Sequence, residues 1–361
     1  MRRRNGNSAG GSDSGVTTDA ALQPRPRRFL RRLFFATFAN LFLLAIIVAG
    51  AVWYAWDQFH APGPLAEPRI VVVPRGAGVD TIARKLRENG VVANGEMVTW
   101  AFTWATRLYA RQKTLKAGEF EFPAEISMRG ALDLIAEGKS VARRFTVAEG
   151  LTTQEILGII EGTEGLSGPI PKDVPEGVLM PETYHFTRGD TREMAVTRMQ
   201  QSMEDTLAEL WPKRADGLPL KTPEEALVLA SIVEKETGVG AERHRVAGVF
   251  INRLNRGMRL QSDPTVVYAV TGGTGPLGRG LRRSELDRDH PYNTYARAGL
   301  PPGPIANPGR AAIEAVLNPE ETDFLYFVAD GTGGHAFSKT LAEHNRNVRV
   351  WRRIERERKS Q

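Results

Sequence analysis

The longest apolar stretch of the chain lies close to its N-terminus. Residues 33–56, LFFATFANLFLLAIIVAGAVWYAW, contain no charged side chain, and Asn40 is the most polar residue among them. A helix needs about 20 apolar residues to cross a bilayer, so this stretch is long enough. The pattern therefore predicts a single transmembrane helix over residues 33–56.

The residues on either side of this stretch predict its orientation. Residues 1–32 carry eight arginines, whereas Trp53, Tyr54 and Trp56 lie at the far end of the apolar stretch. Cytoplasmic flanks of membrane helices are rich in arginine and lysine, and tryptophan and tyrosine gather at the interfaces. We therefore expect a cytoplasmic N-terminus, with residues 57–361 on the other side of the membrane.

A cleaved signal peptide is the alternative interpretation. Ala49-Gly50-Ala51 has the small-x-small form of a cleavage site. The apolar stretch continues past that site and the basic arm is long, and both features favour an uncleaved anchor. Residues 1–32 are predicted to form a disordered basic cytoplasmic arm, and residues 57–68, with their APGPLAEP segment, an extended linker.

Three segments after the linker share one pattern of a short apolar strand, a turn and an amphipathic helix. They are RIVVVPRGAGVDTIARKLRENG (69–90), GEFEFPAEISMRGALDLIAEG (118–138) and RRFTVAEGLTTQEILGIIEGT (143–163). Ile82 and Leu86 lie one turn apart on the first helix, as do Ile156 and Ile160 on the third. VPRGAGVDTIARKL also resembles a LysM module, which binds amino-sugar chains. We predict a small LysM-like β/α subdomain over residues 69–148; a plain α/β support domain is the alternative.

The remainder, residues 149–361, predicts a mixed α+β domain. A helical stretch ends near Trp211, and DFLYFVADGTGGHAF (323–337) is typical of a hairpin before a closing helix with a charged outer face. Residues 271–309 are dense in glycine and proline, which predicts a long ordered loop or lid with a functional role. The fold class is therefore α+β, preceded by one membrane helix.

A helix within this domain carries two glutamates near its end. Thr222 and Glu225 have the spacing of a capping box, with Pro223 at the first helical position, and Gly238 is a natural stop. These signals predict a helix over residues 223–237.

Glu234 and Glu236 point to different faces of this helix, because successive residues are about 100° apart. Glu236 lies one turn beyond Ile232 on the apolar stripe, whereas Glu234 lies on a mixed face. Burial and the negative end of the helix dipole both favour the neutral form of Glu236. A carboxyl group that stays protonated near neutral pH can act as a general acid. An ion pair of Glu236 with Arg243 or Arg245, or a solvent-directed side chain, is the structural alternative.

Composition excludes several other classes of function. The formal net charge of +6 is accounted for by residues 1–32, so the charge does not predict a nucleic-acid-binding surface. The chain has no cysteine, which excludes disulfides, thiolate metal sites and cysteine nucleophiles. Its six histidines lack the close spacing of metal ligands, which argues against a zinc site.

Several long motifs resemble the endolytic murein transglycosylase (YceG-like) family. They are LASIVEKETGVGAERHRVAGVFINRLNRGMRLQSDPTVVYAV, MPETY, HPYNTYARAGLPPGPIANPG and LYFVADGTGGHAFSKTLAEHN. The resemblance covers about residues 69–350. It implies an inner-membrane enzyme with a periplasmic catalytic domain, which cleaves peptidoglycan glycan strands between N-acetylmuramic acid and N-acetylglucosamine.

The resemblance also implies a mechanism and partners. The catalytic acid of the family matches the second glutamate of EKET, Glu236. The cleaved strand would end in 1,6-anhydro-N-acetylmuramic acid, without a metal or cofactor, and nascent strand length would be limited. Peptidoglycan synthases and division or elongation proteins are the implied partners.

Further polar residues are candidates for substrate contact. They are Tyr184, Gln261, Ser262, Asp263, Tyr292, Asn293, Thr294 and Tyr295. The tyrosines can stack on sugar rings and the other side chains can form hydrogen bonds. Structural alternatives remain for three groups: Tyr184 can be a core residue, Asp263 a helix N-cap, and YNTY (292–295) a loop anchor.

Two other functions remain open from the residues alone. A lysozyme-like hydrolase would need a second acid such as Asp263 and would leave reducing ends. A non-enzymatic anchor would bind the cell wall through the LysM-like segment, with Glu236 in a structural role.

Overall fold

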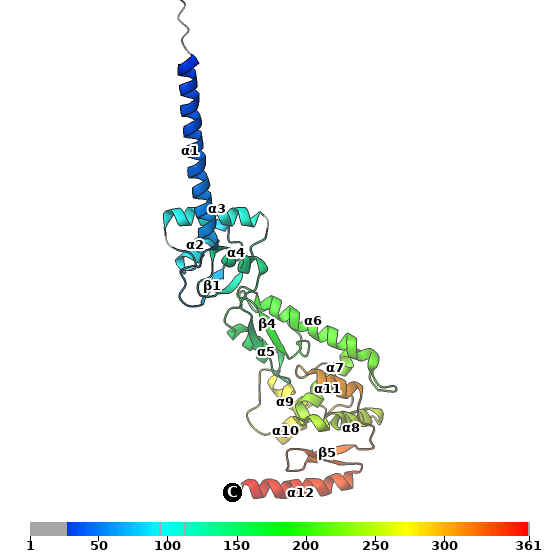
Figure 1. Cartoon of the computed structure of the whole chain (residues 1–361). Coiled ribbons are helices and arrows are strands. Elements are labelled where there is room, and N and C mark those ends of the chain that lie inside the picture. Colours follow the sequence, from blue (N-terminus) through cyan, green and yellow to red (C-terminus); the bar gives the residue numbers. More distant parts are fainter. Residues whose placement is uncertain (1–26, 94, 112, 360–361) are drawn as a thin grey trace, which may run out of the picture.

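A computed structural model describes residues 27–93, 95–111 and 113–359, and Figure 1 shows a long N-terminal helix followed by a small and a larger folded region. Helix α1 spans Arg27–His60, so it begins six residues before the predicted span. Of the predicted arm over residues 1–32, residues 1–26 lie outside the described residues, and residues 27–32 are helical as part of α1. Residues 57–60 of the predicted linker are helical too. Residues Arg31–His60 are apolar and long enough to cross a membrane, by length and composition.

The small region after α1 has its own hydrophobic core. It consists of β1 (Arg69–Val73), α2 (Val79–Glu88), α3 (Glu96–Ala110), β2 (Gly118–Phe122) and α4 (Met128–Glu137). Strands β1 and β2 pair antiparallel, with Val71 opposite Phe120. Ile82, Leu86 and Phe120 are buried together in this core. The first two predicted strand-turn-helix units are therefore confirmed as β1–α2 and β2–α4.

The third unit belongs to a second core. It consists of β3 (Arg143–Thr146), α5 (Thr153–Gly162) and, further along the chain, β4 (Thr183–Phe186). Strand β3 pairs antiparallel with β4, and Ile156 and Ile160 are buried beneath them. Strand β3 therefore packs with the region that follows it, although it lies before the predicted boundary between residues 148 and 149. An ion pair of 2.8 Å between Arg143 and Glu119 joins the two regions.

The third core is largely helical. Its elements are α6 (Arg192–Leu210), η1 (Trp211–Lys213), α7 (Pro223–Glu236), η2 (Gly240–Glu242), α8 (Arg243–Asn255), α9 (Asp263–Thr271), α10 (Arg283–Leu286) and α11 (Arg310–Leu317). Helix α7 contacts α8, α9 and α11 and is buried on all sides from Ala226 to Val233. The predicted hairpin is confirmed as β5 (Tyr326–Ala329) and β6 (His335–Ser338), followed by α12 (Leu341–Lys359).

The glycine- and proline-rich segment 271–309 is a long loop, as predicted, interrupted by the single turn of α10. Its end is held by Asn307, whose side chain is fully buried. The Asn307 amide accepts a hydrogen bond from Leu179 N and donates to Leu151 O and Glu176 Oε1. This side chain therefore ties the loop to two other parts of the molecule. Within the described residues, the fold combines helices with three two-stranded antiparallel sheets.

Candidate active site

Helix α7 begins and ends close to the predicted residues. The Thr222 hydroxyl accepts a hydrogen bond from Glu225 N, which caps the helix. The Glu225 carboxylate accepts from Lys221 N rather than from Thr222 N, so the predicted capping box is only half formed. The helix ends at Glu236, with Thr237 as its C-cap.

Both glutamates at the end of α7 are enclosed by protein. The side chain of Glu234 is only 7% exposed, because α8 and the loop before α11 cover the face that the sequence suggested was mixed. Gly309 N donates a 3.0 Å hydrogen bond to Glu234 Oε2, and an Arg243 guanidinium nitrogen lies 3.6 Å from Oε1. Glu234 is therefore compensated by a cation and a backbone donor.

Glu236 has a different environment. Its Oε1 accepts a 2.5 Å hydrogen bond from the Ser262 hydroxyl. The arginines proposed as structural partners are engaged elsewhere, Arg243 with Glu234 and Arg245 with Glu320. The structure therefore does not support the ion-pair alternative for Glu236.

The surroundings of Glu236 favour its neutral form. Burial raises the pKa of its carboxyl group to about 7, and the negative charge of Asp263 acts in the same direction. The hydrogen bond from Ser262 and the positive charge of Arg253 oppose this increase. The residue as a whole is half-buried, and a carboxyl group with this pKa is partly protonated at neutral pH, as a general acid must be.

Arg253 is a buried cation near the site that sequence reasoning missed. Its guanidinium group donates 2.6 Å hydrogen bonds to Leu325 O and Leu260 O and lies 5.3 Å from the centre of the Tyr326 ring. Burial lowers its pKa below the usual value. Its position on α8 looks like an ordinary helical arginine, so no pattern in the sequence distinguishes it.

The segments around residues 262 and 294 contain most of the candidate contact residues, and they meet beside Glu236. Thr294 Oγ1 accepts from Ser262 N at 3.0 Å and lies 2.8 Å from Thr265 Oγ1. Gln261 N donates to Thr294 O, and Gln261 adopts a left-handed backbone conformation with φ of 50°. Thr294 thus fixes the turn that holds the Ser262 hydroxyl against Glu236.

Asp263 is the first residue of α9 rather than its N-cap, a position that Ser262 occupies. The N-cap alternative is therefore wrong. The exposed Asp263 carboxylate accepts a 2.6 Å hydrogen bond from the Tyr295 hydroxyl. Burial and this carboxylate both raise the pKa of Tyr295.

Asn293 faces the interior of the loop. It is fully buried, and its side-chain nitrogen donates to the carbonyl oxygens of Glu285, Leu286 and Arg288. Its side-chain oxygen accepts from Tyr295 N at 2.9 Å. These bonds favour the loop-anchoring role that the sequence left open.

Tyr292 and Tyr184, two of the predicted substrate contacts, lie in different parts of the structure. Tyr292 is half-buried, with its ring centre 4.8 Å from that of Tyr268. Tyr184 lies on β4, where its ring stacks on Phe145 and its hydroxyl donates a 2.7 Å bond to Met180 O. The structure therefore favours the core interpretation of Tyr184.

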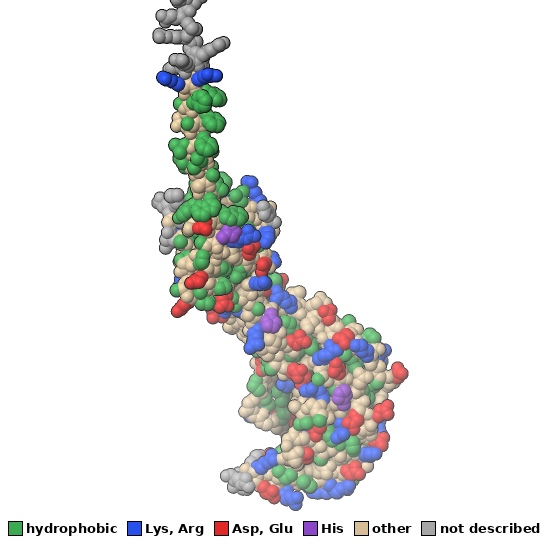
Figure 2. Space-filling view, in the orientation of Figure 1, with side chains coloured by type: hydrophobic (Ala, Val, Ile, Leu, Met, Phe, Trp, Pro, Cys, Tyr) green, Lys and Arg blue, Asp and Glu red, His purple; other side chains and the backbone are tan. Residues whose placement is uncertain are grey.

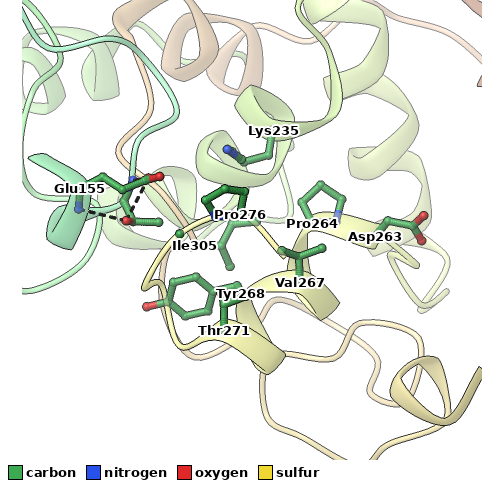
Figure 3. Close-up of a pocket in the computed structure, with 11 residues that line it drawn as sticks. Glu155, Lys235, Asp263, Pro264, Val267, Tyr268, Thr271, Pro276 and Ile305 are labelled. Atoms are coloured by element: carbon green, nitrogen blue, oxygen red, sulfur yellow. Dashed lines mark hydrogen bonds between the residues drawn. The ribbon is translucent and has the colours of Figure 1, made fainter. Parts of the chain in front are cut away.

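A groove of about 360 Å³ lies beside α7 and α9, and Figure 3 shows its lining side chains. Asp263 stands at one end of the groove and Glu155 at the other, with Lys235 above and Tyr268 below. The Lys235 ammonium donates to Gly150 O. Of these four, only Asp263 was a candidate. Lys235 and Tyr268 lie on α7 and α9 beside the candidate residues, whereas Glu155 comes from α5, which no local pattern could place at the groove.

Comparisons with known proteins agree with the motifs. The model of the YceG-like family matches residues 71–350. A Bacillus subtilis (strain 168) protein named endolytic murein transglycosylase is 29% identical over 333 residues, covering 83% of this chain and 90% of that protein. A protein of the same name from Streptococcus pneumoniae serotype 2 (strain D39) is 29% identical over 364 residues, covering 85% of this chain but only 63% of the longer relative. A crystal structure of a yceG-like protein from Listeria monocytogenes shares 31% identity, covers 78% of this chain and 99% of its own, and has a TM-score of 0.47.

Proposed function

This chain belongs to the YceG-like family, and from that premise we propose that it is an endolytic peptidoglycan lytic transglycosylase with Glu236 as its catalytic acid. One observation carries the proposal. The Glu236 carboxyl group has a pKa raised to about 7 and accepts a hydrogen bond from Ser262. Burial also raises the pKa of the neighbouring Glu234, but the hydrogen bond from Gly309 N and the positive charge of Arg243 oppose that increase.

In the proposed reaction, Glu236 protonates the oxygen that links N-acetylmuramic acid to N-acetylglucosamine. The bond between this oxygen and C1 of the muramic ring breaks, and positive charge develops at C1 and the ring oxygen. The Glu236 carboxylate then takes the proton of the 6-hydroxyl group, whose oxygen attacks C1 to close the 1,6-anhydro ring. One carboxyl group serves as acid and then as base, whereas ordinary glycoside hydrolases use two.

The burial of the candidate residues suggests which of them contact the sugar and which position other residues. Gln261 and Asp263 are exposed and Tyr292 and Tyr295 are half-buried, so these four remain candidates for sugar contact. Ser262, Asn293 and Thr294 are buried, and they instead position Glu236 and the loop. Lys235 adds a cation to the groove for an anionic group of the strand.

The remaining regions complete the proposed enzyme. Helix α1 anchors it in the inner membrane with the N-terminus in the cytoplasm, and the region after the linker lies in the periplasm. The LysM-like subdomain of residues 69–148 contacts the glycan, and residues 149–361 cleave it. Anchoring keeps the site close to newly made strands, where synthases and division or elongation proteins are the expected partners.

Mass spectrometry of glycan strands digested by the full chain tests the proposal. Wild type should produce 1,6-anhydro ends, and Glu236→Gln should lower the rate by about 10²–10⁴-fold because the general acid is lost. Glu234→Gln is the matched control, since it makes the same change two residues away and should retain activity.

The other outcomes identify the rival functions. Reducing ends from the wild type would mean a lysozyme-like hydrolase with a second acid. Strands that are bound but uncleaved by wild type would mean a wall-binding anchor. Equal losses in both variants would mean that Glu236 has no special role.

A further inference from the structure

Helix α3 has a second apolar face that points away from the protein. Phe102 and Thr106 are buried against the core of the small region. On the opposite side, Trp100, Trp104 and Leu108 are 67%, 46% and 56% exposed. These three side chains are four residues apart, so they form one continuous stripe along the helix.

This stripe differs from the other exposed apolar side chains that the structure describes after α1. Those are Ile70, Met194, Leu341 and Val350, which are spread over β1, α6 and α12. Single exposed apolar residues are normal on a soluble surface, whereas a patch with two tryptophans indicates an interaction site. The centres of the Trp100 and Trp104 rings lie 6.0 Å apart, so they present one surface.

The position of α3 indicates what covers the stripe. Figure 1 shows α3 lying across the direction of α1, on the side of the small region from which α1 leaves. In the same orientation, hydrophobic side chains gather at this end of the region as well as along α1 (Figure 2). Phe59 of α1 packs against the core of the small region, and α1 and α3 both contact α4. The arrangement of α1 and α3 is therefore fixed by this shared core.

We propose that α3 is an interfacial helix whose Trp100, Trp104 and Leu108 insert into the outer surface of the bilayer that α1 crosses. Helices that lie in a membrane interface place tryptophan and leucine towards the lipid. The Arg107 guanidinium lies 5.6 Å from the centre of the Trp104 ring and pairs with Asp80 at 2.9 Å, so it flanks the stripe with its charge compensated. This inference rests on the proposed membrane span of α1.

Docking of α3 has a consequence for the proposed site. A single helix that crosses a membrane can tilt and rotate, whereas a second contact with the bilayer restricts the orientation of the attached region. The interfacial stripe therefore holds the regions after α1, and with them Glu236, at a constant height above the membrane.

The absence of cysteine allows a direct test with nitroxide labels on single-cysteine variants of the full chain. Trp104→Cys and Leu108→Cys report on the stripe. Leu44→Cys in α1 and Glu121→Cys, an exposed position on β2 of the same region, are the controls. In phospholipid vesicles, the labels at 104 and 108 should collide more often with lipid-soluble oxygen than with a water-soluble nickel chelate. The label at 44 should do the same, and the label at 121 should show the opposite ratio.

Each alternative result has one meaning. Labels at 104 and 108 that behave like 121, while 44 lies deep in lipid, would overturn the inference and leave the anchor intact. Shielding of 104 and 108 from both reagents would mean that a second copy of this chain covers the stripe. A label at 44 that reaches water would overturn both the anchor and the inference, whereas the glycan products would still decide the proposed reaction.

A matched pair of variants then tests which side chains drive docking. With the label at 108, Trp100→Ser combined with Trp104→Ser should make the nickel chelate several-fold more effective. Trp100→Phe combined with Trp104→Phe should leave the label in lipid. Equal results for the two pairs would contradict a role for the aromatic rings.

Discussion

The Ser262 hydroxyl donates a 2.5 Å hydrogen bond to Oε1 of Glu236 and so joins the start of α9 to the end of α7. This bond favours the ionised carboxylate, whereas burial favours the neutral acid, and burial is the larger effect. The pKa of Glu236 is thus set by opposing contributions from burial, Asp263, Ser262 and Arg253. The contributions of Ser262 and Asp263 can be changed separately by substitution.

Removal of the serine hydroxyl should raise the pKa of Glu236. In Ser262→Ala, the limb where kcat/KM falls with increasing pH should move to higher pH, because this limb reports loss of the protonated acid. The rate at its optimum should decrease roughly tenfold, the value of one hydrogen bond to a charged group. A pH–rate profile of glycan cleavage measures both effects.

Asp263→Asn provides the opposite change. The negative charge of Asp263 raises the pKa of Glu236, so its removal should move the same limb to lower pH. Tyr295→Phe is the control, because it removes the hydrogen bond to Asp263 but keeps the charge. Movement of the limb in the same direction in Asp263→Asn and Ser262→Ala would contradict this electrostatic account.

The buried acid should also make stability depend on pH. The folded-state pKa of Glu236, about 7, lies above its usual value of 4.5, so its folded state binds the proton more tightly. The contribution of Glu236 to stability is fully present below pH 4.5 and is lost as the pH rises through 7. This loss should lower the free energy of unfolding by about 3 kcal/mol or less.

Glu236→Gln lacks this cost, so it should unfold at a higher temperature than wild type at pH 8 and at a similar temperature at pH 4.5. Thermal unfolding of both proteins across this range measures the difference. A constant difference at all pH values would mean that ionisation of Glu236 does not control it.

Asn293→Ala should lower the stability of the protein rather than its affinity for substrate. The substitution removes the buried side-chain donor that three carbonyl oxygens share, which should cost about 1–3 kcal/mol in the free energy of unfolding. Denaturant titration measures this cost. An unchanged stability together with a higher KM would instead restore the predicted sugar contact.

Tyr184→Phe tests the other candidate whose position favours a structural role. Loss of its hydrogen bond to Met180 O should reduce the free energy of unfolding by about 1 kcal/mol. The KM for glycan strands should not change, because the ring still packs on Phe145. A several-fold increase in KM without loss of stability would place Tyr184 in the groove.

Local patterns were sufficient for much of the fold. The apolar stretch of residues 33–56 predicted α1, and the strand-turn-helix units predicted β1–α2, β2–α4 and β3–α5. These elements depend on periodicity within a few turns of chain, which is visible without neighbours. Helix α11 was missed, because its short alanine-rich sequence carries little periodicity of its own and it is stabilised by burial against α7 and α8.

The sequence by itself determined that Glu236 was the proposed acid, through its helix position and the EKET motif. Only the tertiary structure decided why it differs from Glu234. Both carboxyl groups are enclosed, so the apolar stripe does not separate them; Arg243 and Gly309 N compensate one, and a serine hydroxyl meets the other. Such partners come from segments distant in the chain, and the pKa of a buried group depends on those partners rather than on its own helix.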